Sequence, residues 1–102
     1  MKHIRLFTGE IALVSDDDAD LARFKWHRQY GGNKKFPYAA TMIQKHTRQS
    51  GIIEVRYTTE CLHRMVAYRL TKDLSKVIAK VKFRDGNRLN CTRENLMVIY
   101  RK

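Results

Sequence analysis

The sequence has few of the residues on which several protein classes depend. Its 102 residues include one proline, five glycines and two cysteines. So little proline and glycine leaves no linker-like or low-complexity stretch. Cys61 and Cys91 lie far apart in the chain and form no CxxC pair, which gives a structural zinc site little support. We expect two reduced thiols, with a disulfide between them as the alternative.

Long apolar runs are also lacking. No run approaches the roughly 18 residues of a membrane span, and residues 1–5 lack the apolar core of a secretion signal. These absences predict a soluble cytoplasmic protein with no membrane partner. Hydrophobic residues nevertheless make up 43% of the chain and aromatic residues 10%, which argues against disorder and suffices for one modest core. We therefore predict a single domain over residues 1–102.

Acidic residues are scarce and unevenly placed. The chain has 21 Lys and Arg but only 10 Asp and Glu, for a net charge of +11. Residues 1–20 carry five of the acids and two of the bases, so residues 21–102 have a net charge of +14. A surplus of this size attracts polyanions, and double-stranded DNA is the partner it favours first. Solubility alone and an acidic protein surface are the alternatives.

Turn residues and apolar spacing predict an α+β fold with a small antiparallel sheet plus helices. The expected strands lie at residues 4–6, 11–14, 25–30, 36–44, 52–57 and 77–83. The expected helices lie at residues 16–24, 59–70 and 91–96, and an extended tail follows. Ser15 is expected to cap the first helix, and Thr58 or Thr59 the second. We assign the acids at 16–18 to the first turn of their helix rather than to a metal site.

The middle of the chain is expected to form one sheet. Gly31-Gly32-Asn33 reads as a turn and residues 46–51 as a loop, which leaves three antiparallel strands with one wet face. The bases expected on that face are Lys25, Arg28, Lys45 and Arg56. A ribbon of this kind can lie in a DNA groove, and an ordinary solvated face is the equal alternative. We divide the domain into a strand, helix and sheet part at 1–57 and a second part at 58–102.

The most informative pattern lies in the last third. It reads VKFRDGNRLNCTRENL at residues 81–96, with LHR upstream at 62–64. Together these segments resemble the HNH homing endonucleases of phages and mobile introns. Members of that family have an aspartate and a histidine before an Asp-Gly-Asn turn, and Glu-Asn-Leu after it. The resemblance covers most of the chain and implies a phage or mobile-element origin.

The resemblance also implies roles for several residues. In the family, a ββα-metal motif holds one divalent cation between the aspartate and the asparagine of Glu-Asn-Leu, while the histidine is the general base. Asn95 matches the ligand asparagine, and Asp85, Gly86 and Asn87 match the turn, with Asn87 as its brace. His63 and Arg64 match a helical pair that shapes the phosphate surface.

Two matches fail at the positions that do the chemistry. Lys82 stands at the ligand aspartate and Phe83 at the general base, while Arg84 replaces an aliphatic residue and Cys91 an asparagine. A phenyl ring cannot accept a proton, and loss of a general base costs about 10²–10⁴ in rate. An ammonium ~4 Å from a dication repels it by on the order of 8 kcal/mol at an effective dielectric near 20. The motif is thus a degenerate ββα-metal motif, and we expect no cofactor.

The sequence therefore favours a DNA-binding protein that has lost nuclease activity. Lys82 and Arg84 share a strand face, and we expect Lys82 to supply the charge that the metal supplies in the family. The candidate DNA contacts are Arg28, Arg56, His63, Arg64, Lys80, Lys82, Arg84, Arg88 and Arg93. One alternative is a nickase that uses Mg²⁺ or Mn²⁺ and an atypical base, supplied by a histidine distant in sequence. Another is a module that binds an acidic host protein and inhibits a nuclease, polymerase or defence complex.

Overall fold

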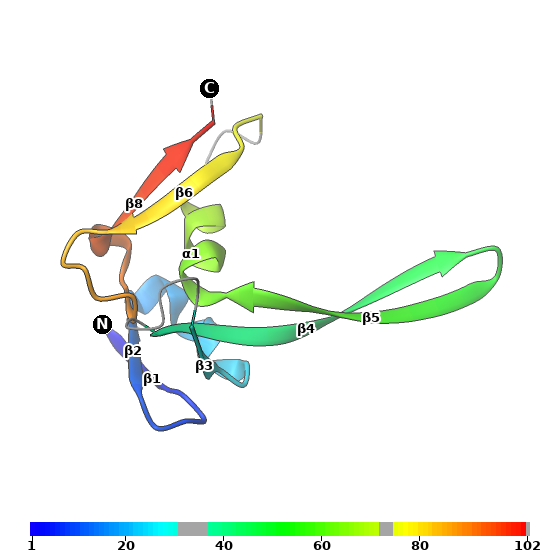
Figure 1. Cartoon of the computed structure of the whole chain (residues 1–102), viewed down its shortest axis with the longest axis horizontal. Coiled ribbons are helices and arrows are strands. Elements are labelled where there is room, and N and C mark those ends of the chain that lie inside the picture. The colour runs from blue at the N-terminus through cyan, green and yellow to red at the C-terminus, as the bar shows by residue number, and fades with distance from the viewer. Residues whose placement is uncertain (31–36, 72–74, 102) are drawn as a thin grey trace.

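The chain forms an α+β structure with a long two-stranded arm projecting from a smaller body (Figure 1). The computed structural model describes residues 1–30, 37–71 and 75–101, apart from the side chains of residues 45 and 47. The strands are β1 (Lys2–Arg5), β2 (Ile11–Val14), β3 (His27–Tyr30), β4 (Pro37–Gln49), β5 (Ile52–Cys61), β6 (Ile78–Phe83), β7 (Asn90–Cys91) and β8 (Leu96–Tyr100). The helices are the 3-10 helices η1 (Asp16–Arg23) and η2 (Arg93–Asn95) and the α-helix α1 (Leu62–Leu70).

The strands form three small sheets. Their orders are β1-β2-β7, β3-β4-β5 and β6-β8, and every pair except β2–β7 is antiparallel. The prediction of an α+β fold with small antiparallel sheets, including the sheet in the middle of the chain, is confirmed. The parallel pair sets Leu13 opposite Asn90 and Val14 opposite Cys91. It therefore joins the start of the chain to the segment that carries the Asp-Gly-Asn turn.

The core lies where α1, the β1–β2 hairpin and the base of the arm meet. Trp26 anchors it, because its ring is buried and its Nε1 donates a 2.7 Å hydrogen bond to the Leu21 carbonyl. On α1, Leu62 and Val66 are fully buried one turn apart, as an amphipathic helix requires. The buried cluster comprises Ile4, Leu6, Ala12, Val14, Leu21, Trp26, Ala39, Leu62, Val66, Cys91 and Leu96. This core fixes α1 beside β6.

The three predicted helices are shorter or tighter than expected. The first is the 3-10 helix η1, and the Ser15 side chain does not cap it; instead Ser15 Oγ accepts a hydrogen bond from the Arg93 N–H. The second begins at Leu62, because β5 continues through the β-branched Thr58 and Thr59 to Cys61. Ser15 thus stands at the predicted N-cap position of η1 but makes no side-chain capping bond there, whereas the cap predicted at Thr58 or Thr59 was wrong, because Cys61 is the N-cap of α1.

The short helix predicted at residues 91–96 is present only as one turn of 3-10 helix, Arg93–Asn95, with Thr92 at its N-cap. The extended tail predicted after it is strand β8. Strand β8 pairs with β6, setting Leu96 opposite Phe83 and Met97 opposite Lys82. The sequence LMVIY of β8 is rich in β-branched and aromatic residues, and pairing with an available strand therefore prevails over a helix.

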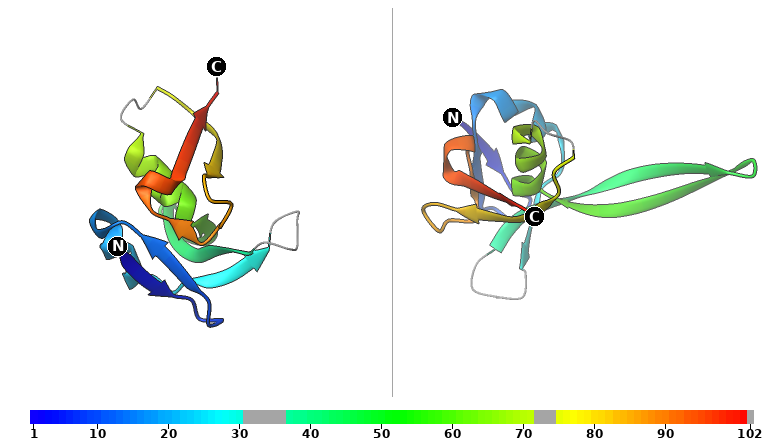
Figure 2. Two further views of the ribbon diagram at one scale, coloured as in Figure 1. Left: turned by 90° about the vertical axis from the view of Figure 1, so that its left-hand side faces the viewer. Right: turned by 90° about the horizontal axis from the view of Figure 1, so that it is seen from above.

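The predicted loop at residues 46–51 is instead the end of a hairpin. Strand β4 runs to Gln49 and β5 starts at Ile52, so only Ser50 and Gly51 form the turn. Both have positive φ, 53° and 78°, as a two-residue hairpin turn of type I′ requires. The hairpin leaves the body as an arm in both Figure 1 and the right-hand view of Figure 2. The turn predicted at residues 31–33 lies outside the described residues.

Candidate nucleic-acid interface

A pocket of about 700 Å³ lies between α1, β6 and the base of the arm. Three of its lining side chains carry the cationic groups typical of phosphate surfaces, and the described lining includes no carboxylate. The lining residues are Tyr38, Cys61, His63, Lys80, Val81, Lys82, Phe83, Gly86 and Arg88. Strands β4, β5 and β6 each pack on α1, so the core fixes the walls of the pocket. The fold thus brings together four of the predicted contacts: His63, Lys80, Lys82 and Arg88.

The imidazole of His63 is held within this pocket between two aromatic rings. It packs edge-to-face against Phe83, with ring centroids 5.3 Å apart, and against Tyr38 at 5.8 Å. Its Nδ1 is buried and has no hydrogen-bond partner among the described residues. Burial, followed by the charges of Arg64 and Arg88, lowers the pKa of His63 to about 4. The ring is therefore neutral at pH 7.

Phe83 occupies the position that the resemblance assigns to the general base. Its side chain is half-buried and packs on the core cluster from the end of β6. The contact with His63 means that a histidine distant in sequence reaches the ring that replaces the family's histidine. Sequence reasoning gave His63 a role in shaping the phosphate surface, but could not foresee this contact, which depends on how α1 packs against β6.

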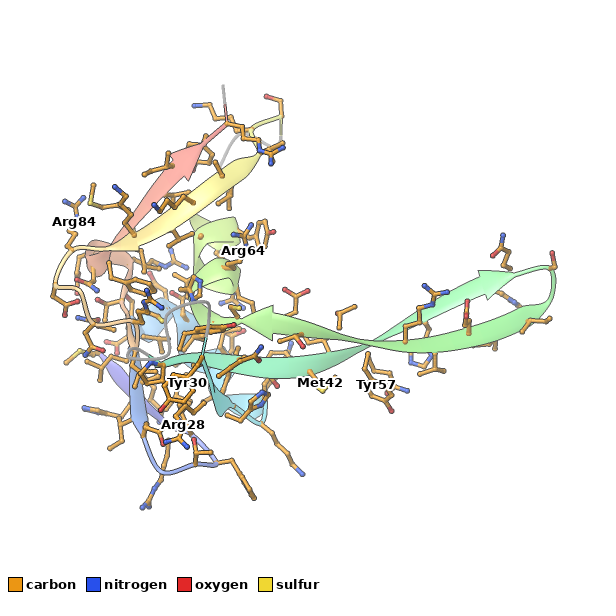
Figure 3. The ribbon with its side chains drawn as sticks, in the orientation of Figure 1. Arg28, Tyr30, Met42, Tyr57, Arg64 and Arg84 are labelled. Carbon is orange, nitrogen blue, oxygen red and sulfur yellow. The ribbon has the colours of Figure 1, made fainter. Side chains whose placement is uncertain are left out.

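The lysines of β6 give the pocket its positive charge. Lys80 and Lys82 alternate along the strand with the half-buried Val81 and Phe83, so both ammonium groups are exposed on one face. Lys82, which the resemblance sets at the position of a ligand aspartate, has its side chain in the lining of the pocket. Arg84, expected to act with Lys82, is exposed but does not line the pocket. Figure 3 shows Arg84 at the end of β6 far from the arm.

The loop after β6 is rigid through hydrogen bonds of its own. The Asn87 N–H donates to Asp85 Oδ1 at 2.8 Å, and Asn87 Oδ1 accepts from the Leu89 N–H at 3.0 Å. This is the bracing role that the resemblance implies for Asn87. Gly86 has a φ of 78°, which an L side chain rarely adopts. Hydrogen bonds from the Asn90 amide and the Asn87 N–H lower the pKa of Asp85, so it stays ionised at neutral pH.

Asn95, which the resemblance matches to a metal ligand, serves the same loop. Its Nδ2 donates to Asp85 Oδ1 at 3.0 Å and to the Asn90 carbonyl at 2.8 Å, while its Oδ1 accepts from the Asp85 N–H. The described residues contain no cluster of three or more His, Cys, Asp and Glu side chains that could hold a metal ion. One amide oxygen, with a lysine at the position that the resemblance assigns to the ligand aspartate, is a poor donor set for a divalent cation. The residues present therefore do not fit the family's metal.

Arg93 is engaged within the fold. Its Nε and Nη2 donate to the two oxygens of the fully buried Asp18, at 3.0 and 2.8 Å, and Arg69 Nη1 reaches the same carboxylate at 3.2 Å. Arg93 does not line the pocket. Sequence reasoning missed this network, because it assigned Asp18 to a helical first turn and Arg93 to DNA.

The other predicted bases are spread over the surface. Arg28 lies on β3 with its Nε 3.6 Å from Glu10, and its guanidinium lies over the Tyr30 ring. Arg64 lies on α1 with its guanidinium over Tyr68 (Figure 3). Arg56 lies on the arm, 3.2 Å from Glu54. Lys25, another base expected on the wet face of the sheet, is exposed. The side chain of Lys45, expected on the same face, lies outside the described residues.

The arm is the largest feature that sequence reasoning missed. Only its base belongs to the three-stranded sheet, because β3 pairs with β4 no further than Ala40. Beyond that point apolar side chains are exposed, namely Met42, Ile52, Ile53, Val55 and Tyr57. The Ser50-Gly51 pair directly before the β-branched Ile52 and Ile53 is the local signal that indicates a hairpin here.

Comparison of the chain with protein-family models, with curated proteins and with solved structures found no match. Among the described residues, no helix has the length and apolar character needed to cross a membrane. Functional inference therefore depends on the pocket, the arm and the residues that form them.

Proposed function

We propose that the protein binds double-stranded DNA with an HNH-like domain, in which a degenerate ββα-metal motif has become a phosphate-binding pocket. The single observation that carries this proposal is the cationic pocket itself. Lys80, Lys82 and Arg88 line it, and the described lining includes no acid. Lys82 there takes the position at which the family has a metal-binding carboxylate.

The chemistry of the pocket suits binding rather than cleavage. A lysine binds a phosphate as a point charge, and the Tyr38 and His63 rings give the pocket a partly apolar wall. Phosphate contacts of this kind provide affinity and strong salt dependence, with little sequence choice. We therefore expect moderate affinity for any duplex, falling steeply as salt is raised. Phage or mobile-element origin belongs to the same proposal.

Charge reversal in the pocket tests the proposal. Lys82→Glu should weaken duplex binding by about tenfold at low salt and flatten the slope of log K against log salt by about 1. Lys2→Glu makes the same change in net charge on the exposed strand β1 and is the matched control. Affinities measured by fluorescence anisotropy on a labelled duplex decide between them. Equal losses in the two variants would reject the pocket, and no duplex binding by the unmodified protein would favour an acidic protein partner.

His63 favours a second candidate function, a DNA nickase with an atypical base. Its imidazole is neutral and lies against Phe83, so it can in principle accept a proton from water in the pocket. Incubation of supercoiled plasmid with the protein and either Mg²⁺ or Mn²⁺ separates the two functions. Nicking that is abolished by EDTA and by His63→Ala supports the nickase, whereas intact plasmid supports binding alone.

A further inference from the structure

The arm has no partner for its apolar side chains within the part of the chain that the structure describes. Met42 exposes 57% of its surface, Tyr57 63%, Ile53 62% and Ile52 70%. A two-stranded ribbon with one face uncovered is only marginally stable alone in water. The fold therefore presents a long apolar ribbon that gains stability when another molecule covers it.

Strand register gathers most of the exposed apolar side chains of the arm on one face and both acids of β5 on the other. Residues paired across the ribbon share a face, and the faces alternate along each strand. We use "arm face" for the set that comprises Met42, Gln44, His46, Arg48, Ile53, Val55, Tyr57 and Thr59. It contains no Asp or Glu, because both acids of β5, Glu54 and Glu60, belong to the opposite face. In Figure 3, Met42 and Tyr57 point to the same side of the ribbon.

The tip of the arm places a cation beside a wedge-shaped apolar group. Arg48 pairs with Ile53, so their side chains lie next to each other on the arm face. Ile52, opposite Gln49, projects on the other face, and the two-residue turn follows at once. An aliphatic side chain at the end of a two-stranded ribbon can enter a narrow cleft that is too small for a helix or a wider sheet.

We propose that the arm face lies along the minor groove of duplex DNA and that Ile53 at its tip inserts between base pairs and bends the duplex. This inference rests on the proposed DNA binding. Apolar side chains fit the sugar-lined walls of the minor groove, and aliphatic wedges between base steps kink DNA toward the major groove. Arg48 offers charge complementarity to the flanking phosphates, and no carboxylate on the arm face opposes it.

The dimensions and the position of the pocket support the same occupant. The ten residues of β5 span about 33 Å, at roughly 3.3 Å per residue, which matches one turn of B-form DNA at about 34 Å. Tyr38 and Cys61, at the base of the arm, line the cationic pocket and belong by alternation to the arm face. A duplex anchored in the pocket can therefore follow the arm without crossing an acidic surface. If the arm face bound a protein instead, nothing would require this face to continue into a cationic pocket.

Bending of a labelled duplex tests the inference. Fluorescence transfer between dyes at the two ends of a 30-base-pair duplex reports the bend, and anisotropy on the same samples reports binding. We expect the unmodified protein to bend the duplex by about 20–90°. Ile52→Ala/Ile53→Ala should remove most of this bend while the affinity falls by less than about tenfold, because the pocket contacts remain. Val77→Ala, at another exposed aliphatic residue away from the arm, should leave both readings unchanged.

The outcomes separate the inference from the proposed function. Binding without bending, or an equal bend with the double alanine variant, overturns the wedge but leaves DNA binding intact. No binding in anisotropy overturns both. A 2-aminopurine base at the kinked step adds a direct reading, because its fluorescence rises when the base is unstacked. A fluorescence rise that the double variant abolishes supports insertion, and unchanged fluorescence contradicts it.

Discussion

The guanidinium of Arg93 binds the buried carboxylate of Asp18 through two hydrogen bonds, at 3.0 and 2.8 Å. The two residues are 75 positions apart in the chain. Asp18 lies on η1 near the start, whereas Arg93 begins η2 just after the Asp-Gly-Asn loop. Arg69 of α1 reaches the same carboxylate at 3.2 Å. One buried acid thus ties together three elements that hold the pocket in place.

Loss of this carboxylate should destabilise the whole domain. Asp18→Asn keeps the shape but removes the charge that two guanidinium groups face. Removing one partner of a buried ion pair costs about 3–5 kcal/mol, and we expect about 2–3 kcal/mol because both arginine side chains are about a third exposed to water. Urea unfolding at pH 7 gives the free energy.

Asp17→Asn is the matched control for Asp18→Asn. The Asp17 side chain is 80% exposed, and its shortest distance to Arg93 is as long as 4.0 Å. Loss of its charge should therefore change the free energy of unfolding by less than about 0.5 kcal/mol. Similar losses of stability in the two variants would show that the buried pair is not what joins η1 to η2.

The buried His63 should make the stability depend on pH. Burial lowers its folded-state pKa from 6.5 to about 4, so the unfolded chain takes up a proton first as the pH falls. The contribution is fully present above pH 6.5 and is lost as the pH falls toward 4, by about 3 kcal/mol in total. His63→Gln cannot titrate, and its free energy of unfolding should lose this slope. Urea unfolding at pH 7, 5.5 and 4.5 compares the two proteins, and equal slopes would contradict the burial of a neutral ring.

The loop after β6 shows what the sequence could predict. The Asp-Gly-Asn sequence alone indicates the turn at Gly86, and the HNH resemblance implies the brace at Asn87; both act within a few residues. Strand β2 was predicted with its bounds correct for a similar reason, since its apolar run ends at clear turn or capping residues. Local chemistry decides such features, so they can be recognised without the rest of the fold.

The arm, the His63 contact and the Asp18 network could not be predicted in this way. The outer half of β4 carries polar side chains, namely Gln44, His46, Arg48 and Gln49, which give no apolar pattern typical of a strand. This segment is a strand because β5 pairs with it. Likewise, Asp18 resembles an ordinary first-turn acid until η2 is packed against η1. Each of these features depends on contacts between segments that are distant in the sequence.

Restoring the two missing residues tests whether the pocket derives from a nuclease centre. Lys82→Asp/Phe83→His places a carboxylate and an imidazole at the positions that the HNH resemblance assigns to metal binding and catalysis. The change removes the local cation, so the repulsion of on the order of 8 kcal/mol that we expect against a dication disappears. Among the described residues, the Asp85 N–H is the single donor to Asn95 Oδ1, which leaves a lone pair of that oxygen for a metal. We expect weak nicking of supercoiled plasmid with Mn²⁺, which EDTA abolishes, from the double variant alone.

Each single variant should leave the plasmid intact, since one lacks the base and the other keeps the ammonium beside the metal. A double variant that is folded by circular dichroism but neither binds Mn²⁺ nor nicks DNA would argue that the likeness to HNH enzymes ends at the turn.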